Sequence, residues 1–314
     1  MEIAPSFRLL QAADVPAAQR LREFAHWNQT GQDWLNLLAM EPQGCFAAEV
    51  NGQVIGTATT TRFQPASGPG SFGWVGMVLV HPEFRGQGVG SALLRKACDY
   101  LHGCGVETIK LDATPMGQPV YLKLGFRAEC SLERWAGTVE QAVSLLSTSQ
   151  AVSLPLPSQA GQPAPQLPAG PRIAPLTASG VASVTAYDAL AFGADRGAIL
   201  RRWSQCWPEC AIAAWEEQRL AGYALARRGT NYHQAGPIVC EGPEAGQALL
   251  TRMFQLLAGQ AVIIDILSEN TWVREWVANA GLLMQRPLTR MYQGPNTAPG
   301  RRERIVAIAG PEVG

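Results

Sequence analysis

The sequence predicts a protein of the α/β (α+β) class that folds as two domains in tandem. A length of 314 residues fits two domains of about 100 to 200 residues each. Apolar spacings in the first half alternate between the periods of strands and helices, and the last part of that pattern recurs in the second half. A proline-rich stretch without charged residues separates the two halves.

The composition is typical of a globular protein without a strong net electrostatic field. Apolar residues make up 47% of the chain and charged residues 16%, which excludes a largely disordered chain. The 25 basic and 25 acidic side chains give a formal charge of zero. We therefore expect neither nucleic acid nor a membrane surface as a partner.

Cysteine and histidine usage predicts a reducing compartment and no metal site. The seven cysteines are odd in number and form no CxxC pair, and the four histidines are scattered. The N-terminal residues lack a basic region followed by an apolar one, and no apolar run is long enough to span a membrane. The expected location is the cytoplasm.

The segment 141–170 divides the chain. It carries no charged residue, and from Leu154 onward it is rich in proline, alanine and glutamine, which is typical of a semi-rigid linker. The predicted domains are therefore residues 1–140 and 171–314.

The first third of domain one predicts a strand, two helices and a hairpin. Residues 3–9 fit a short strand, Asp14 can cap a helix that ends near Ala25, and 33–39 fit a second helix. Asn51-Gly52 lies between the apolar runs 45–50 and 53–62, and this dipeptide favours the tight turn of a hairpin.

The rest of domain one alternates between strands and helices. Residues 72–80 predict a longer strand that ends at His81-Pro82, because proline cannot donate to a sheet. An amphipathic helix then carries Leu93, Leu94, Ala97, Cys98 and Leu101 on one stripe. Residues 108–113 predict the next strand, and a short helix opens at Pro119 and ends at Gly125.

The end of domain two repeats this pattern. A strand ends at Asp265-Ile266, as one ends at Asp112 in domain one, and a helix follows in both. The spacing from Gly125 to Arg134 equals that from Gly281 to Arg290. One fold used twice would explain this, although two α/β domains that share ordinary turn chemistry would also do so.

The segment most indicative of function is Arg85-Gly-Gln-Gly-Val-Gly-Ser91, which has the features of a phosphate-binding turn. It joins an apolar strand to a helix N-terminus, where unpaired N–H groups and the helix dipole favour a phosphate. A P-loop is absent because the chain contains no Gly-Lys pair. A dinucleotide motif would need GxGxxG, which is not this spacing, although Asp112 lies 22 residues beyond Gly90.

This stretch resembles the acyl-CoA motif R/Q-x-x-G-x-G/A of the GCN5-related N-acetyltransferases (GNATs). The preceding Val78-Leu-Val-His-Pro82 is similar to the fourth strand of that family, and Val120-Tyr-Leu-Lys-Leu-Gly-Phe126 is similar to its Y-x-K-L-G-F element. The resemblance covers residues 1 to about 140. It implies that each domain is a mixed, mostly antiparallel twisted sheet flanked by helices.

The resemblance also implies acetyl-CoA as cofactor and assigns roles to residues. The backbone of the fourth strand would hold the pantetheine arm as an added strand, and Tyr121 would protonate the departing thiolate. The implied cofactor-binding residues are Val78, Leu79, Val80, Arg85, Gly86, Gln87, Gly88, Val89, Gly90 and Ser91.

Neither the base nor the acceptor site is marked by a clear motif. The predicted strand 72–80 contains no acid, so Asp112, His81 or ordered water would take the proton of the amine. Trp27, Asp33 and Trp34 could bind a cationic amine, but the favoured interpretation is that the two tryptophans pack the first helices.

Domain two departs from the motif. Its segment 236–246 contains two acids and no arginine, and no tyrosine matches Tyr121 before Gly281. We interpret it as a degenerate GNAT-like domain that completes the acceptor pocket or covers the first sheet, as in a pseudo-dimer within one chain. The ending Arg290-Met-Tyr-Gln-Gly294 resembles tandem members of the family.

The predicted function is an N-acetyltransferase that moves the acetyl group of acetyl-CoA to a small-molecule amine by direct attack. The alternative is an acyl-CoA-binding sensor or interaction module without transferase activity. The sequence specifies neither the acceptor amine nor the oligomeric state.

Overall fold

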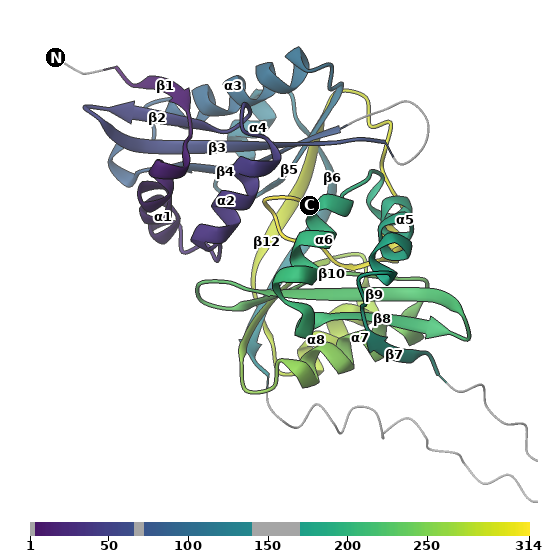
Figure 1. Cartoon of the computed structure of the whole chain (residues 1–314). Coiled ribbons are helices and arrows are strands. Elements are labelled where there is room, and N and C mark those ends of the chain that lie inside the picture. The colour runs from purple at the N-terminus through teal and green to yellow at the C-terminus, as the bar shows by residue number, and fades with distance from the viewer. Residues whose placement is uncertain (1–3, 66–71, 140–169) are drawn as a thin grey trace, which may run out of the picture.

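The computed structural model of the chain describes residues 4–65, 72–139 and 170–314. The predicted linker 141–170 lies outside the described residues except for Gly170. Figure 1 shows the two halves, joined by long strands that run from one half into the other.

The first half follows the predicted order of elements. Its strands are β1 (Ser6–Leu9), β2 (Phe46–Val50), β3 (Gln53–Phe63), β4 (Phe72–Val80), β5 (Thr108–Ala113) and β6 (Arg127–Thr138). Its α-helices are α1 (Val15–Phe24), α2 (Gly31–Met40), α3 (Val89–Gly103) and α4 (Gln118–Lys123). The hairpin prediction is confirmed: Asn51 and Gly52 have φ of 50° and 77° between β2 and β3, as a tight hairpin turn requires.

One predicted cap is wrong. Asp14 precedes α1 but makes no hydrogen bond to the N–H groups of that helix. Its carboxylate instead accepts from the Gln11 N–H at 2.8 Å and from the Arg8 guanidinium at 2.7 Å. The cation on β1 therefore draws the carboxylate away from the helix end.

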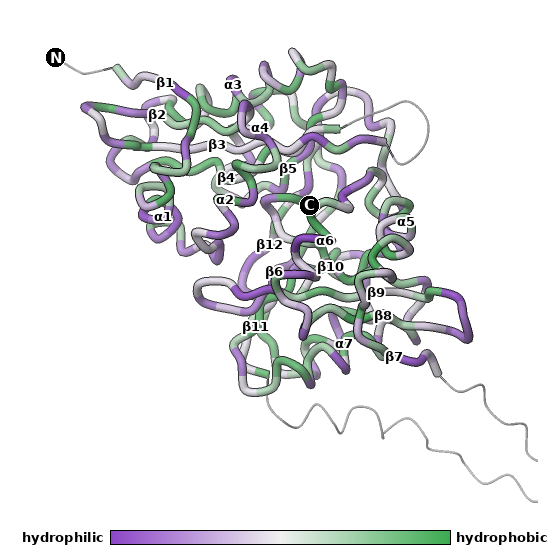
Figure 2. Tube along the Cα trace, viewed as in Figure 1, coloured by the Kyte–Doolittle hydropathy of each residue, from purple (hydrophilic) through white to green (hydrophobic). Residues whose placement is uncertain are grey.

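The second half repeats the order of the first. Its strands are β7 (Arg172–Pro175), β8 (Ala211–Glu216), β9 (Arg219–Arg228), β10 (His233–Cys240), β11 (Ala261–Leu267), β12 (Leu283–Gln293) and β13 (Ile305–Ala307). Its α-helices are α5 (Gly180–Phe192), α6 (Gly197–Cys206), α7 (Pro243–Leu256) and α8 (Thr271–Asn279). In Figure 2 the turn between β8 and β9 is hydrophilic, while the strands that lead to it are largely hydrophobic.

The two halves share one sheet, because they exchange strands. Among the described residues the strand order is β1-β2-β3-β4-β5-β12-β6-β11-β10-β9-β8-β7, and β13 pairs with β10. Strand β12 of the second half lies between β5 and β6, and β6 of the first half lies between β12 and β11. Each half therefore completes the sheet of the other, which leaves neither β5 nor β11 as an unpaired edge.

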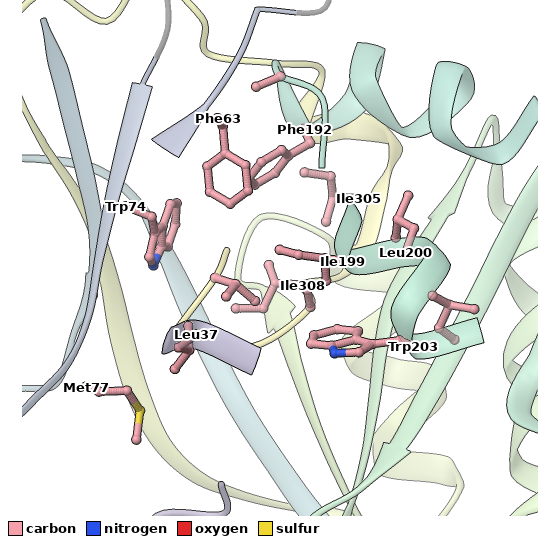
Figure 3. Close-up of a cluster of buried hydrophobic side chains, with 14 of the residues drawn as sticks. Leu37, Phe63, Trp74, Met77, Phe192, Ile199, Leu200, Trp203, Ile305 and Ile308 are labelled. Carbon is pink, nitrogen blue, oxygen red and sulfur yellow. The ribbon is translucent and has the colours of Figure 1, made fainter. Parts of the chain in front are cut away.

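Three groups of buried apolar side chains hold this arrangement together. One lies under α3 in the first half and a second lies under α7 in the second half. The third contains residues of both halves, and Figure 3 shows it. There the ring of Phe192 from α5 packs edge-on against Phe63 and Phe72, with centroids 5.0 and 5.2 Å apart. This shared core buries apolar surface that either half alone would expose to water.

Candidate functional site

Strands β4 and β5 run parallel over a short distance and then diverge. Their pairing ends where Trp74 faces Lys110. Beyond that point β4 keeps β3 on one side, and no strand of the described chain pairs with its other edge. An open edge of this kind can take an extended ligand as an added strand. The predicted cofactor-binding residues Val78, Leu79 and Val80 lie on this part of β4.

A bulge redirects the open part of β4. The register with β3 shifts so that Met77 and Val78 stand opposite Ala58 alone, and Met77 has a φ of 50°. The Thr57 hydroxyl donates to the Met77 carbonyl at 2.8 Å, which holds this conformation. Bulges bend a strand and re-aim its groups, and here Met77 and Val78 line the cavity described below.

The glycine-rich turn lies where β4 leads into α3. Gly86 and Gly88 have φ of 76° and 82°, in the left-handed region that favours glycine. A Cβ at either position would meet no atom within 4 Å, so the backbone conformation and not crowding requires glycine here. Gly88 precedes the first residue of α3 and supplies no side-chain cap, which leaves the first N–H groups of that helix without a side-chain acceptor.

The other predicted residues of the turn surround these glycines. Arg85 is exposed, and its Nε donates to the Val80 carbonyl at 3.0 Å. Gln87 is exposed, Val89 packs into the core under α3, and Gly90 and Ser91 are half-buried. The structure thus brings all the predicted turn residues to one end of the open β4 edge.

Tyr121 lies on α4 and lines the same cavity as Met77 and Val78. Its ring packs at a tilt against Phe126, with centroids 6.1 Å apart. A Cβ at Gly117 would lie 2.9 Å from the Tyr121 ring, so that glycine makes room for the tyrosine. Burial raises the pKa of Tyr121 to about 12 and keeps the phenol protonated near neutral pH.

The cavity lies between the two halves, and we call it the interdomain cavity. Residues from the first half that line it include Trp27, Gln29, Val78, Leu111, Asp112 and Tyr121. The exchanged strand β6 adds Arg134, and the second half adds Arg286, Leu288, Pro311 and Glu312. Both halves therefore contribute side chains to this cavity.

Two buried ion pairs cross between the halves beside the cavity. Asp112 of β5 accepts two hydrogen bonds from Arg290 of β12, at 2.8 and 2.9 Å. Arg134 of β6 donates two hydrogen bonds to Asp265 of β11, at 2.7 and 2.8 Å. The two pairs join equivalent positions of the repeat, and each connects an exchanged strand to its neighbour.

Glu312 enters the cavity from the segment that follows β13. It is buried, accepts a hydrogen bond of 2.7 Å from the Gln29 amide and also pairs with Arg227. Burial raises the pKa of Glu312, and Arg227 opposes this shift. Gly76 allows the close approach, because a Cβ there would lie 2.6 Å from the Glu312 carbonyl oxygen.

Only one of the three predicted acceptor residues reaches the cavity. Trp27 is half-buried and lines it. Trp34 is 0% exposed in the shared core, which matches the packing role weighed for it. Asp33 is buried too: it caps α2 through Thr30 and forms an ion pair of 2.8 Å with Arg227. Neither Asp33 nor Trp34 is placed to contact an acceptor in this cavity.

The two side chains considered as bases lie differently. Asp112 lines the cavity, but Arg290 occupies both of its oxygens. His81 is not among the residues that line the cavity; its ring packs edge-on against Phe24 at 4.9 Å.

Sequence reasoning missed the polar residues that the second half contributes. Arg286 and Glu312 lie outside any motif, and they reach the cavity only because β12 is exchanged and the last residues fold back toward Gly76. The one available signal was the extra arginine four residues before Arg290 in the repeated ending.

The second half has a matching gap, but the chain itself occupies it. Strands β10 and β11 also pair in parallel over a short distance, ending where Ala235 faces Ile264. Beyond this point β13 pairs with β10, opposite Ile238 and Val239. The next residue, Ile308, donates its N–H to the carbonyl of Asp265 on β11 at 3.0 Å. A segment of the protein thus fills the place that is open in the first half.

The described residues contain no group of three or more His, Cys, Asp or Glu side chains that could hold a metal ion. Within the same ranges, none of the helices combines the length and apolar character that crossing a membrane requires.

The fold and the site together define an acyltransferase with two similar domains. The model of the acetyltransferase (GNAT) family matches residues 10–126, and that of an acetyltransferase (GNAT) domain matches residues 184–307. The chain belongs to the GNAT superfamily and carries two GNAT domains in tandem. This family uses acyl-CoA donors.

Two relatives match most of the chain in sequence. The uncharacterized N-acetyltransferase YitH of Bacillus subtilis is 25% identical over 288 residues, which cover 90% of this chain and 89% of the relative. The holothin acyltransferase of a Pseudoalteromonas species is 22% identical and covers 92% and 87%. The chain is an acyltransferase by these comparisons.

Solved structures confirm the fold. A structure from Pyrococcus horikoshii has a TM-score of 0.74 at 19% identity and covers 99% of this chain and 96% of its own. A GCN5-related N-acetyltransferase from Sphaerobacter thermophilus has a TM-score of 0.60 at 17% identity and covers 92% and 95%.

Proposed function

We propose that the protein transfers the acetyl group of acetyl-CoA to the amine of a small-molecule acceptor in the interdomain cavity. The observation that carries this proposal is the convergence of three features: the open edge of β4, the glycine-rich turn at the start of α3, and Tyr121 in the cavity at the bulge. The holothin acyltransferase supports a small acceptor. So does a glucosamine 6-phosphate N-acetyltransferase of Trypanosoma brucei brucei, which is 34% identical over 85 residues that cover 26% of this chain and 57% of the relative.

In this proposal residues 1–140 form the catalytic domain and bind the cofactor along β4. Backbone groups of Val78, Leu79 and Val80 pair with the amides of the pantetheine arm. The N–H groups from Gln87 to Ser91 bind the pyrophosphate at the start of α3, and Arg85 adds a cation. Arg85 is exposed, so its guanidinium can exchange the hydrogen bond to the Val80 carbonyl for hydrogen bonds to a phosphate.

The reaction is a direct transfer. The acceptor ammonium gives one proton to solvent, and its nitrogen attacks the thioester carbonyl carbon to give a tetrahedral oxyanion. A backbone N–H of β4 near the bulge stabilises this oxyanion. The carbon–sulfur bond then breaks, Tyr121 protonates the sulfur, and the second proton of the nitrogen passes through solvent to restore the Tyr121 phenol. The products are the N-acetyl compound and CoA thiol.

Tyr121 is the group we assign to the departing thiolate. Its raised pKa, about 12, keeps the phenol protonated at every pH at which the acceptor reacts. A thiol of ordinary pKa near 8.5 is more acidic than this phenol, so the transfer is completed by the second amine proton, which restores the phenol. The tyrosine therefore donates a hydrogen bond to the sulfur and passes its proton as negative charge develops there.

The second half has no cofactor site in this proposal. Strand β13 occupies the gap between β10 and β11 where a pantetheine arm would pair. At the start of α7, Glu241 lies in place of the glycine-rich turn and pairs with Arg219 and Arg304. Residues 171–314 serve the first half instead, through β12 and Glu312.

Thiol release tests the proposal. Purified protein with acetyl-CoA and an amine library should release CoA thiol, and Tyr121→Phe should lower kcat about 10- to 100-fold with little change in the KM for acetyl-CoA. Tyr292→Phe, on β12 outside the cavity, is the matched control and should keep the wild-type kcat. An unchanged kcat in Tyr121→Phe would remove that residue from the mechanism.

A CoA-binding module without transferase activity gives a different result. Acetyl-CoA at about 100 times its Kd should raise the stability by about 2.7 kcal/mol in both cases. Only the enzyme releases thiol when an amine is added. Binding without any amine-dependent thiol release would favour the module.

A further inference from the structure

Arg286 lies beside a second arginine, and this pair of like charges lowers the stability of the folded protein unless an anion binds there. On the exchanged strand β12 it lies directly opposite Arg134 of β6. On the other side of Arg134 lies Asp265 of β11, and both of its oxygens accept hydrogen bonds from Arg134. Two cations thus share one carboxylate across three neighbouring strands, and like charges directly opposite each other destabilise a sheet.

Arg286 has no anionic partner of its own in the described chain. No Asp or Glu among residues 4–65, 72–139 and 170–314 lies within 4.0 Å of its guanidinium, and its Nε is buried without a hydrogen-bond partner. Burial and, to a smaller extent, Arg134 lower its pKa to about 10, so it still carries its charge at neutral pH. A buried polar group left unpaired costs free energy.

The repeat shows that this arginine is not required by the fold. The same position of the first half, four residues before Arg134, is Cys130, and it faces Arg290 across β12 and β6. At that site Arg290 pairs with Asp112 and the neighbouring strand adds no second cation. The unmatched arginine occurs only at the repeat position that lines the interdomain cavity.

An acidic side chain also lines the interdomain cavity. Glu312 is buried there and shares the cation Arg227 with Asp33, which is buried outside the cavity lining. Gln29 donates to Glu312, while its own carbonyl oxygen Oε1 is buried without a partner. The cavity therefore offers an unpaired cation at Arg286 and, at Glu312 and Gln29, acceptor groups with a negative excess.

We propose that the acceptor amine also carries an oxyanion, a carboxylate or a phosphate, and that Arg286 binds this group while the ammonium faces Glu312 and Gln29. This inference rests on the proposed function and adds the class of acceptor to it. A guanidinium matches the geometry of either oxyanion with two parallel hydrogen bonds. The second half thereby determines which amine the first half acetylates.

Paired acceptors test the inference. Each pair differs only in the anionic group: phenylalanine with phenethylamine for a carboxylate, and glucosamine 6-phosphate with glucosamine for a phosphate. The wild-type protein should prefer the anionic member of at least one pair in kcat/KM. Arg286→Met, which keeps an unbranched apolar stem and removes the guanidinium, should lower that preference by about 10- to 100-fold, as for a lost hydrogen bond to a charged group.

Two controls keep the result specific. Arg252→Met removes an exposed arginine of α7 and should leave the preference as in the wild type. Arg286→Met should bind acetyl-CoA with the wild-type affinity, because Arg286 lies away from the glycine-rich turn. Whichever pair responds identifies the oxyanion as a carboxylate or a phosphate.

Calorimetry with CoA already bound separates this inference from the proposed function. If no amine releases thiol but anionic amines bind the wild type more tightly than Arg286→Met, the transferase proposal fails and the anion site stands. If neutral amines are equal or better substrates and ligands, or if Arg286→Met retains the preference, the anion site is refuted while the transferase proposal stands.

Discussion

Removing Arg290 tests whether the buried charges between the exchanged strands hold the two halves together. In Arg290→Met the carboxylate of Asp112, whose side chain is 0% exposed, loses both hydrogen bonds and its counter-charge. The Arg290 guanidinium also lies 4.8 Å from the Trp74 ring centroid, a contact that the variant loses. Breaking a buried pair by removing one partner costs about 3 to 5 kcal/mol.

The cost should depend on pH in a defined direction. Burial raises the pKa of Asp112, and Arg290 is the main influence that lowers it, so the variant leaves the pKa raised further. A carboxyl with a raised pKa in the folded state binds a proton there more readily than in the unfolded chain. The contribution of the Asp112 carboxyl to stability is therefore fully present below its pKa in the unfolded chain. It is lost as the pH rises through its pKa in the folded protein. The deficit should be larger at pH 8 than at pH 5.

Urea unfolding at pH 5 and pH 8 measures the loss of stability in Arg290→Met. Because one sheet and one core connect the halves, we expect a single transition, with a lowered midpoint and an unchanged slope. The double variant Asp112→Leu with Arg290→Met should recover most of the loss, since no charge remains buried. A cost below about 1 kcal/mol at pH 8, or an equal cost at both pH values, would refute the reasoning.

Three further changes test other parts of the structure. Gly88→Ala forces a side chain into a φ of 82°, so it should destabilise the protein by about 1 to 2 kcal/mol and weaken acetyl-CoA binding; a wild-type melting temperature and Kd would contradict the role of the turn. Arg85→Ala removes an exposed cation and its hydrogen bond to the Val80 carbonyl, and it should raise the Kd for acetyl-CoA about tenfold with little change in the melting temperature, as calorimetry and thermal unfolding can show. Phe192→Ala removes a ring that is 4% exposed from the core shared by both halves and should cost about 3 to 5 kcal/mol in urea; a loss confined to the second half would show that the halves unfold independently.

Some features of this protein depend on only a few neighbouring residues. The hairpin at Asn51-Gly52 and the turn with Gly86 and Gly88 follow from backbone conformations that few other residues adopt. Tyr121 was found because a local motif surrounds it, and it lines the cavity. The residues predicted for the cofactor lie together for the same reason: the strand, turn and helix that carry them are consecutive in the chain.

Trp34 and Asp33 show the limit of such reasoning. An aromatic residue and an acid near a predicted loop look alike in sequence whether they face a ligand or the core. Trp34 is buried in the shared core, and Asp33 is held by Thr30 and by Arg227, which is 194 residues away in the chain. No local pattern contains that arginine.

The class of fold, the repeat and the glycine-rich turn could be predicted from the residues alone, because each depends on the conformational preferences and spacing of neighbouring residues. The exchange of β6 and β12, the filling of the second gap by β13 and the position of Arg286 and Glu312 at the interdomain cavity became visible in the folded chain. Strand pairing joins residues distant in sequence through backbone groups that every residue carries. Which strands pair therefore depends on how completely the fold buries the apolar faces of the sheet and pairs its buried charges. Neither can be seen in a local stretch of sequence.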